Sequence, residues 1–116
     1  MNEELGQLDA DLKGLFVENN IEEIQQILGE QPDAVVKEIN DYNWNIIRKY
    51  YDNGKFELLL SHLVFVAYTC FVTEYAYKSG MVAEQEYQDR ITIFGDIYDR
   101  KRIQTQENGD IDKIPV

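Results

Sequence analysis

The stretch LLLSHLVFVAYTCFV, residues 58–72, is the longest apolar run of the chain and decides the fold. From Leu63 to Val72 it is apolar on every side of a helix, and a helix of that kind is buried on all sides. The helical pattern continues over roughly 25 residues, which argues against a strand. The apolar run itself is shorter than the roughly 20 residues needed to cross a bilayer. We therefore expect a central buried helix over about 55–79, and no membrane segment.

The segments on both sides of this run predict further helices. Their apolar residues recur at three- and four-residue steps, which indicates amphipathic helices. We expect helices at residues 3–18 and 21–28, one presenting Val35 to Ile39, an aromatic one from Tyr42 to Tyr51, and one at 83–100. The sequence thus predicts an all-α single domain over residues 1–102, a bundle of four or five helices around the central helix.

Residues 103–116 are polar, and we expect them to form a frayed C-terminal tail. A tight hairpin turn at Asn108-Gly109 is the alternative.

The negative charge of the chain is concentrated near its N-terminus. Residues 1–41 contain eleven acidic and two basic residues, whereas residues 42–116 contain eleven acidic and nine basic residues. Nearly all of the net charge of −11 therefore belongs to the first third. An acidic surface attracts basic partners and repels nucleic acid and anionic lipid. These acids form either an ordinary solvated helix face or one patch that binds a partner, and the sequence alone leaves both interpretations open.

The single cysteine and the N-terminal residues indicate the compartment. Cys70 has no second cysteine in this sequence to form a disulfide with. The acidic start Met-Asn-Glu-Glu-Leu lacks the apolar segment of a signal peptide. We expect a cytoplasmic, bacterial protein.

The sequence offers little for catalysis, a metal or a cofactor. His62 and Cys70 lie eight residues apart, about 12 Å along a helix, which is too far for a thiolate–imidazole pair. We expect a buried His62 bonded to a backbone or hydroxyl partner, and Cys70 as a core residue. One His and one Cys cannot build a zinc tetrad, and no Glycine-rich phosphate loop is present. The sequence predicts no enzyme, no metal and no cofactor.

The one basic cluster is Arg100-Lys101-Arg102. Nucleic-acid binding needs more clustered Lys and Arg than this, so we expect no direct nucleic-acid contact. We expect the cluster to stabilise a helix C-terminus, where cations are favourable.

Seven residues are the candidates for a partner-binding site. Five are acids of the first third, and two are tyrosines, because Tyr and Trp are favoured at interface hot spots. Core packing is the alternative use of the aromatic residues. The candidates are Glu18, Glu22, Glu23, Glu30, Asp33, Tyr42 and Tyr51.

Residues 56–94 carry a resemblance to a known family. The run LLLSHLVFVAYTCFVTEYAYKSGM is followed by the motif E-x-E-Y, and Ala76, Gly80, Glu84 and Tyr87 mark its positions. This pattern resembles the helical segment that precedes the DNA-binding module of some AraC-type regulators. The resemblance implies a helical packing or oligomerisation unit. No helix-turn-helix pattern follows here, and no catalytic residue is carried over.

A small acidic helical protein without catalytic groups is suited to inhibition by binding. We expect an immunity protein that neutralises a basic toxin, such as a nuclease, by electrostatic docking. One alternative is a regulatory or dimerisation module, a homo-oligomer, as the AraC-type resemblance implies. The other is an acidic decoy that mimics DNA.

Overall fold

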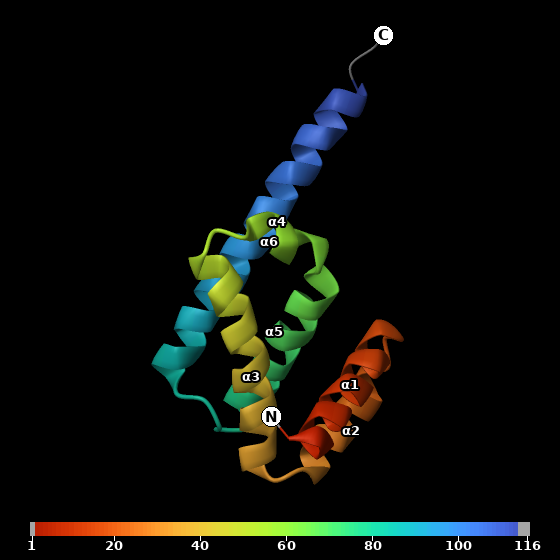
Figure 1. Cartoon of the computed structure of the whole chain (residues 1–116), viewed down its shortest axis with the longest axis vertical. Coiled ribbons are helices and arrows are strands. Elements are labelled where there is room, and N and C mark those ends of the chain that lie inside the picture. The colour runs from red at the N-terminus through yellow and green to blue at the C-terminus, as the bar shows by residue number, and fades with distance from the viewer. Residues whose placement is uncertain (1, 114–116) are drawn as a thin grey trace.

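The computed structural model describes residues 2–113, with side chains as far as Gln106. Six helices follow one another, and the part of the chain that the model describes contains no strand. The prediction of an all-α bundle is confirmed, although the helices are divided differently from the prediction. The helices are α1 (Glu3–Val17), α2 (Ile21–Glu30), α3 (Asp33–Asp52), α4 (Phe56–Ser61), α5 (Leu63–Lys78) and α6 (Glu84–Lys113), as Figure 1 shows.

α3 is one continuous helix, where the sequence predicted two. The prediction used Asn40 and Asp41 as caps of a second helix. The Asn40 side chain instead points inward: its Nδ2 donates to Thr73 Oγ1 at 2.7 Å, and its Oδ1 accepts from Arg90 at 2.7 Å. A polar residue that finds partners on two neighbouring helices has no reason to interrupt its own helix.

The predicted helix over 55–79 is broken at His62, and that prediction was wrong. The hydroxyl of Ser61 donates to the Glu57 carbonyl at 2.8 Å, and His62 Nδ1 lies 2.9 Å from the Leu58 carbonyl. The His62 amide bonds to the Leu59 carbonyl instead, three residues back. Side chains therefore occupy carbonyls that the next helical turn needs. His62 is exposed, contrary to the prediction, although its predicted backbone partner is present.

α5 is the central helix, but it is not buried on all sides. It contacts α1, α3, α4 and α6. Val66, Tyr68 and Val72 are buried, whereas Val64 in the first turn is 58% exposed. The break turns α4 aside and leaves this first turn partly uncovered. No helix within the described residues has both the length and the apolar content to cross a membrane.

The apolar core has two parts that share α5. One part joins α1 and α2 to α3 and α5 and includes Leu12, Leu28 and Val72. The other part joins α3, α4, α5 and α6 around Trp44 and Phe94, whose rings meet edge to face with centroids 5.3 Å apart. The two ends of the bundle thus depend on one central helix.

A buried carboxylate connects α1 to the centre of the bundle. Asp9 is 4% exposed. Its Oδ1 accepts from Asn43 Nδ2 of α3 and from the Tyr68 hydroxyl of α5, each at 2.9 Å. Its Oδ2 pairs with Lys13 Nζ at 2.7 Å. All three partners are donors, so the charge is compensated inside the protein.

A buried cation connects α6 to α3 in a similar way. Arg90 is 4% exposed and donates to Asn40, to Asp41 at 2.9 Å and to Glu86. Its guanidinium carbon lies 5.3 Å from the centre of the Trp44 ring, which is a cation–π distance. This contact fixes the start of α6 against α3.

The last helix is longer than predicted. The sequence predicted a helix over 83–100 and a frayed tail from residue 103, but α6 continues to Lys113. Its end projects beyond the other helices in Figure 1. Asn108-Gly109 therefore does not form the alternative hairpin turn. The remainder of the tail, residues 114–116, lies outside the described residues.

Removing the buried carboxylate should loosen α1. We expect Asp9→Ala to lower the free energy of unfolding by about 3 kcal/mol, because Asn43 and Tyr68 lose their buried partner. Asp11→Ala, two residues along on the exposed side, should change it by less than about 0.5 kcal/mol. Urea unfolding measures both variants. Equal losses would show that Asp9 does not hold α1 in place.

Alkaline pH should also weaken the fold through Tyr68. Burial, and then the charge and hydrogen bond of Asp9, raise the pKa of Tyr68 far above the ordinary value of 10.0. The unfolded chain releases this proton near pH ~10 while the folded chain keeps it, so the free energy of unfolding falls above about pH 10. Tyr68→Phe should make that fall less steep and cost about 1 kcal/mol at neutral pH. An unchanged slope above pH ~10 in denaturant titrations would contradict this.

Candidate functional site

The N-terminal helices α1 and α2 form a hairpin on one side of the bundle (Figure 1). Asn2 begins α1 by accepting from the Leu5 amide at 2.8 Å, which is an N-cap. Asn19 takes a positive φ of 60° in the turn between the two helices. Leu12 of α1 and Leu28 of α2 face the core, so the opposite sides of both helices meet solvent.

The exposed charges of this hairpin are negative, with the partly exposed Lys13 as the exception. Lys13 is the only base in residues 2–30, and it pairs with the buried Asp9. Among the described residues, no Lys or Arg lies within ion-pair distance of the exposed acids of the hairpin. We call these acids the acidic face: Glu3, Glu4, Asp11, Glu18, Glu22, Glu23 and Glu30.

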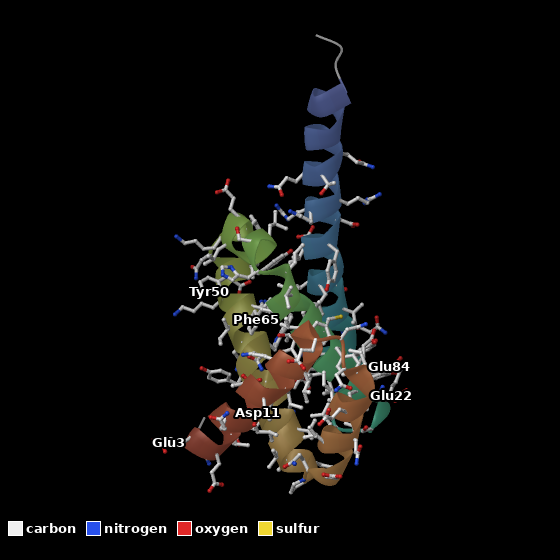
Figure 2. The ribbon with its side chains drawn as sticks, turned by 90° about the vertical axis from the view of Figure 1, so that its right-hand side faces the viewer. Glu3, Asp11, Glu22, Tyr50, Phe65 and Glu84 are labelled. Carbon is white, nitrogen blue, oxygen red and sulfur yellow. The ribbon has the colours of Figure 1, made fainter. Side chains whose placement is uncertain are left out.

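The acids of the acidic face follow the helical period. Glu4, Asp11 and Glu18 are seven residues apart, so they form a row along one side of α1 with a spacing of about 10 Å. Glu22 and Glu30 are two turns apart on the side of α2 that faces away from the buried Leu28. Figure 2 turns the hairpin toward the viewer and brings Glu3, Asp11 and Glu22 into one view. These three acids all belong to the hairpin, which lies on one side of the bundle (Figure 1).

The structure brings most of the predicted acidic residues onto the same hairpin, but it does not bring the two predicted tyrosines together. Glu18, Glu22, Glu23 and Glu30 all belong to the acidic face, and Asp33 is exposed where α3 begins. The tyrosines do not join one another. Tyr42 and Tyr51 are nine residues apart on α3, which is two and a half turns, so they lie on opposite sides of the helix.

The two tyrosines also differ in what they contact. Tyr42 is 43% exposed beside a shallow hollow that contains Lys37 and Glu38. Tyr51 is half-buried, with its ring against Phe56 and its hydroxyl donating to Asp96 at 2.7 Å. This hydrogen bond raises the pKa of Tyr51 and lowers the pKa of Asp96. Tyr51 therefore connects α3, α4 and α6.

Sequence reasoning missed two features of the surface. It left Glu3, Glu4 and Asp11 out of the site, although the spacing of Glu4, Asp11 and Glu18 could have indicated them. It also missed an apolar groove of about 510 Å³ beside the break at His62, for which the sequence holds no Gly or Pro signal. We call it the kink groove, lined by Lys13, Phe16, Val17, residues 60–65, Tyr68 and Lys101.

The groups that the sequence offered for chemistry remain apart. Burial, and then the charge of Glu74, raise the pKa of the Cys70 thiol to about 11, so it is protonated at neutral pH. His62 is exposed and lines the kink groove and a second hollow, and neither is lined by a carboxylate. Within the described residues, no three His, Cys, Asp or Glu side chains come together to hold a metal ion.

The basic cluster does not stabilise a helix C-terminus, and that prediction was wrong. α6 continues past Arg100-Lys101-Arg102, so the cluster lies inside the helix. Arg100 pairs with Asp96 at 3.1 Å and stacks 3.7 Å from the Phe56 ring centre. Arg102 pairs with Asp99 at 3.4 Å. Two of the three cations are thus compensated by α6 itself.

No protein-family model, no curated protein and no solved structure matches this chain. The segment that resembles AraC-type regulators, residues 56–94, corresponds to α4, α5 and the first part of α6. The resemblance stays a prediction.

The burial of Cys70 leads to a simple reactivity test. A rise of the pKa from 9.0 to about 11 leaves about a hundredfold less thiolate at neutral pH. Alkylation by iodoacetamide should therefore be at least about a hundredfold slower than for free cysteine, since the thiolate is the nucleophile. The rate should recover in urea. Fast alkylation of the folded protein would show an accessible, activated thiol.

Proposed function

We propose that this protein inhibits a basic partner protein by docking its acidic face onto it. The concrete form of the proposal is an immunity protein of the bacterial cytoplasm that neutralises a cationic toxin, such as a nuclease. One observation carries it: the exposed acids of the α1–α2 hairpin lack compensating ion pairs among the described residues, and the one base of the hairpin, the partly exposed Lys13, pairs with the buried Asp9. Uncompensated carboxylates keep their full attraction for a cationic surface.

The proposed mechanism is electrostatic. Nucleases hold phosphates with Lys and Arg, and carboxylates presented in a row can pair with such side chains in place of phosphates. The field of the acidic face would steer the encounter and raise the association rate. Blocking the cationic surface needs no bond-making by this protein.

The hairpin is well held for this role. Leu12, Ile24 and Leu28 are buried, and Asp9 fixes α1 to α3 and α5. Little ordering of the helices would be needed on binding, and preorganisation of this kind favours affinity. Tyr42, which is exposed, is a better anchor than Tyr51, whose hydroxyl is already bonded to Asp96.

The spacing of the acids favours a protein partner over mimicry of DNA. The row on α1 has one carboxylate per about 10 Å, by the 1.5 Å rise of a helix. One DNA strand carries a phosphate about every 3.4 Å along the axis. A decoy that mimics DNA would need a denser row of carboxylates. Binding to scattered Lys and Arg on a protein surface does not need that density.

Charge reversal on α2 tests the proposal. The wild-type protein and Glu22→Lys/Glu23→Lys are titrated by surface plasmon resonance against cationic toxins encoded beside the gene, at low and high salt. We expect binding that weakens at least about tenfold at high salt, and a further loss of about a hundredfold in the variant, mostly through slower association. The wild-type protein should inhibit the nuclease activity of the toxin when this is measured in parallel. The variant binds more weakly and should leave that activity largely intact.

Asp52→Lys/Glu57→Lys is the matched control. It makes the same change of net charge on exposed residues of α3 and α4. At high salt, where the long-range field of the protein is screened, we expect its affinity to lie within about threefold of that of the wild type. Binding that ignores salt, or that both double variants weaken equally, would refute docking through the acidic face.

A further inference from the structure

The kink groove is an open apolar site that the proposed function leaves unused. Its volume of about 510 Å³ falls within the range of small-molecule sites. Phe16 and Val17 at the end of α1 form one wall, and Val64 and Tyr68 of α5 contribute to another. Val17 is 70% and Val64 is 58% exposed, so apolar surface here meets water. Such surface is favourable to cover with an apolar ligand.

The charges that line the groove have the opposite sign to those of the whole chain. The net charge is −11, yet among the described residues the only charged ones in the lining are Lys13 and Lys101. Lys13 pairs with the buried Asp9, while its ammonium lies 4.9 Å from the centre of the Phe65 ring. Lys101 donates to Gln104 at 3.2 Å, and no described carboxylate lies within ion-pair distance of it. Lys101 is thus the cation that is open to a ligand.

The start of α5 adds to this preference. His62 gives no side-chain cap, and the first turn of α5 contains no acid. Backbone amides at an uncapped helix start favour an anion nearby. Leu63, Val64 and Phe65 belong to this first turn and also line the groove.

We propose that the kink groove binds a free long-chain carboxylate, with its alkyl chain on the apolar walls and its carboxylate paired with Lys101. Apolar walls alone would fit many partners, but walls with cations and without acids select an apolar molecule with an anionic head. A basic partner, as suits the acidic face, is disfavoured here. The groove lining includes no acid of the acidic face, so this proposal does not rest on the proposed function.

Calorimetric titration with decanoate and dodecanoate, below their micelle concentrations, tests the groove. Dodecanoate should bind about tenfold more tightly than decanoate, because two more methylenes are covered. Dodecyltrimethylammonium, with the same chain and a cationic head, should bind at least about tenfold more weakly than dodecanoate. Equal binding of the two head groups would overturn the proposal.

Two variants assign the site. Lys101→Met removes the charge but keeps an unbranched apolar side chain, and it should weaken dodecanoate binding about tenfold. The matched Lys78→Met at the exposed end of α5 should change the binding less than about twofold. Val64→Asp places a like charge on an exposed position and should weaken it about a hundredfold without unfolding the protein. Unchanged binding in Lys101→Met or Val64→Asp would refute the site.

Sedimentation of the same proteins tests whether a second copy of the chain occupies the groove instead. We expect the wild type and Val64→Asp to sediment alike without ligand. A wild-type oligomer that Val64→Asp dissociates would show that a second copy covers the groove, and that result would overturn the carboxylate proposal.

Discussion

The arrangement of the N-terminal half depends on one buried negative charge. Asp9 is surrounded by three donors, from its own helix, from α3 and from α5. Removing a carboxylate from water costs several kcal/mol unless its lone pairs are filled, so these donors must be in place together. The same contact decides the position of α1, and through α1 the position of α2. An acid thus holds the helix whose other acids face solvent.

The exposed acids and the kink groove involve different residues of this chain. The exposed acids lie on the outer side of the hairpin, while the kink groove at the end of α1 is lined by cations and apolar residues. Both surfaces depend on α1, one on its outer side and the other at its end. A ligand in one and a partner on the other would meet the same helix.

Periodicity predicted most of the helices, because one buried side of a helix repeats apolar residues at a fixed step. It did not show that some polar residues at the same helical step are buried together with the apolar ones. Asp9 follows Leu5 by four and precedes Leu12 by three, so its position pointed inward, but its charge placed it among the solvent-facing acids. Asn43 likewise follows Ile39 by four and precedes Ile47 by four. Whether such a residue is buried depends on donors from other helices.

The sequence did not predict the break at His62 or the length of α6, for other reasons. The break contains no Pro or Gly and depends on two side chains bonding to carbonyls four residues back. The end of α6 is polar, so periodicity gives no signal there. Glu18, Glu22, Glu23 and Glu30 of the acidic face were predicted because charge is visible in a sequence. The kink groove was not, because it exists only where two helices part.

The hydrogen bond at the break also defines the chemistry of the His62 ring. A carbonyl oxygen can only accept, so Nδ1 must carry the proton in the contact with Leu58. The proton on Nδ1 is therefore committed to the backbone at the bend. Nε2 is the ring nitrogen that remains for any other hydrogen bond that this exposed side chain makes.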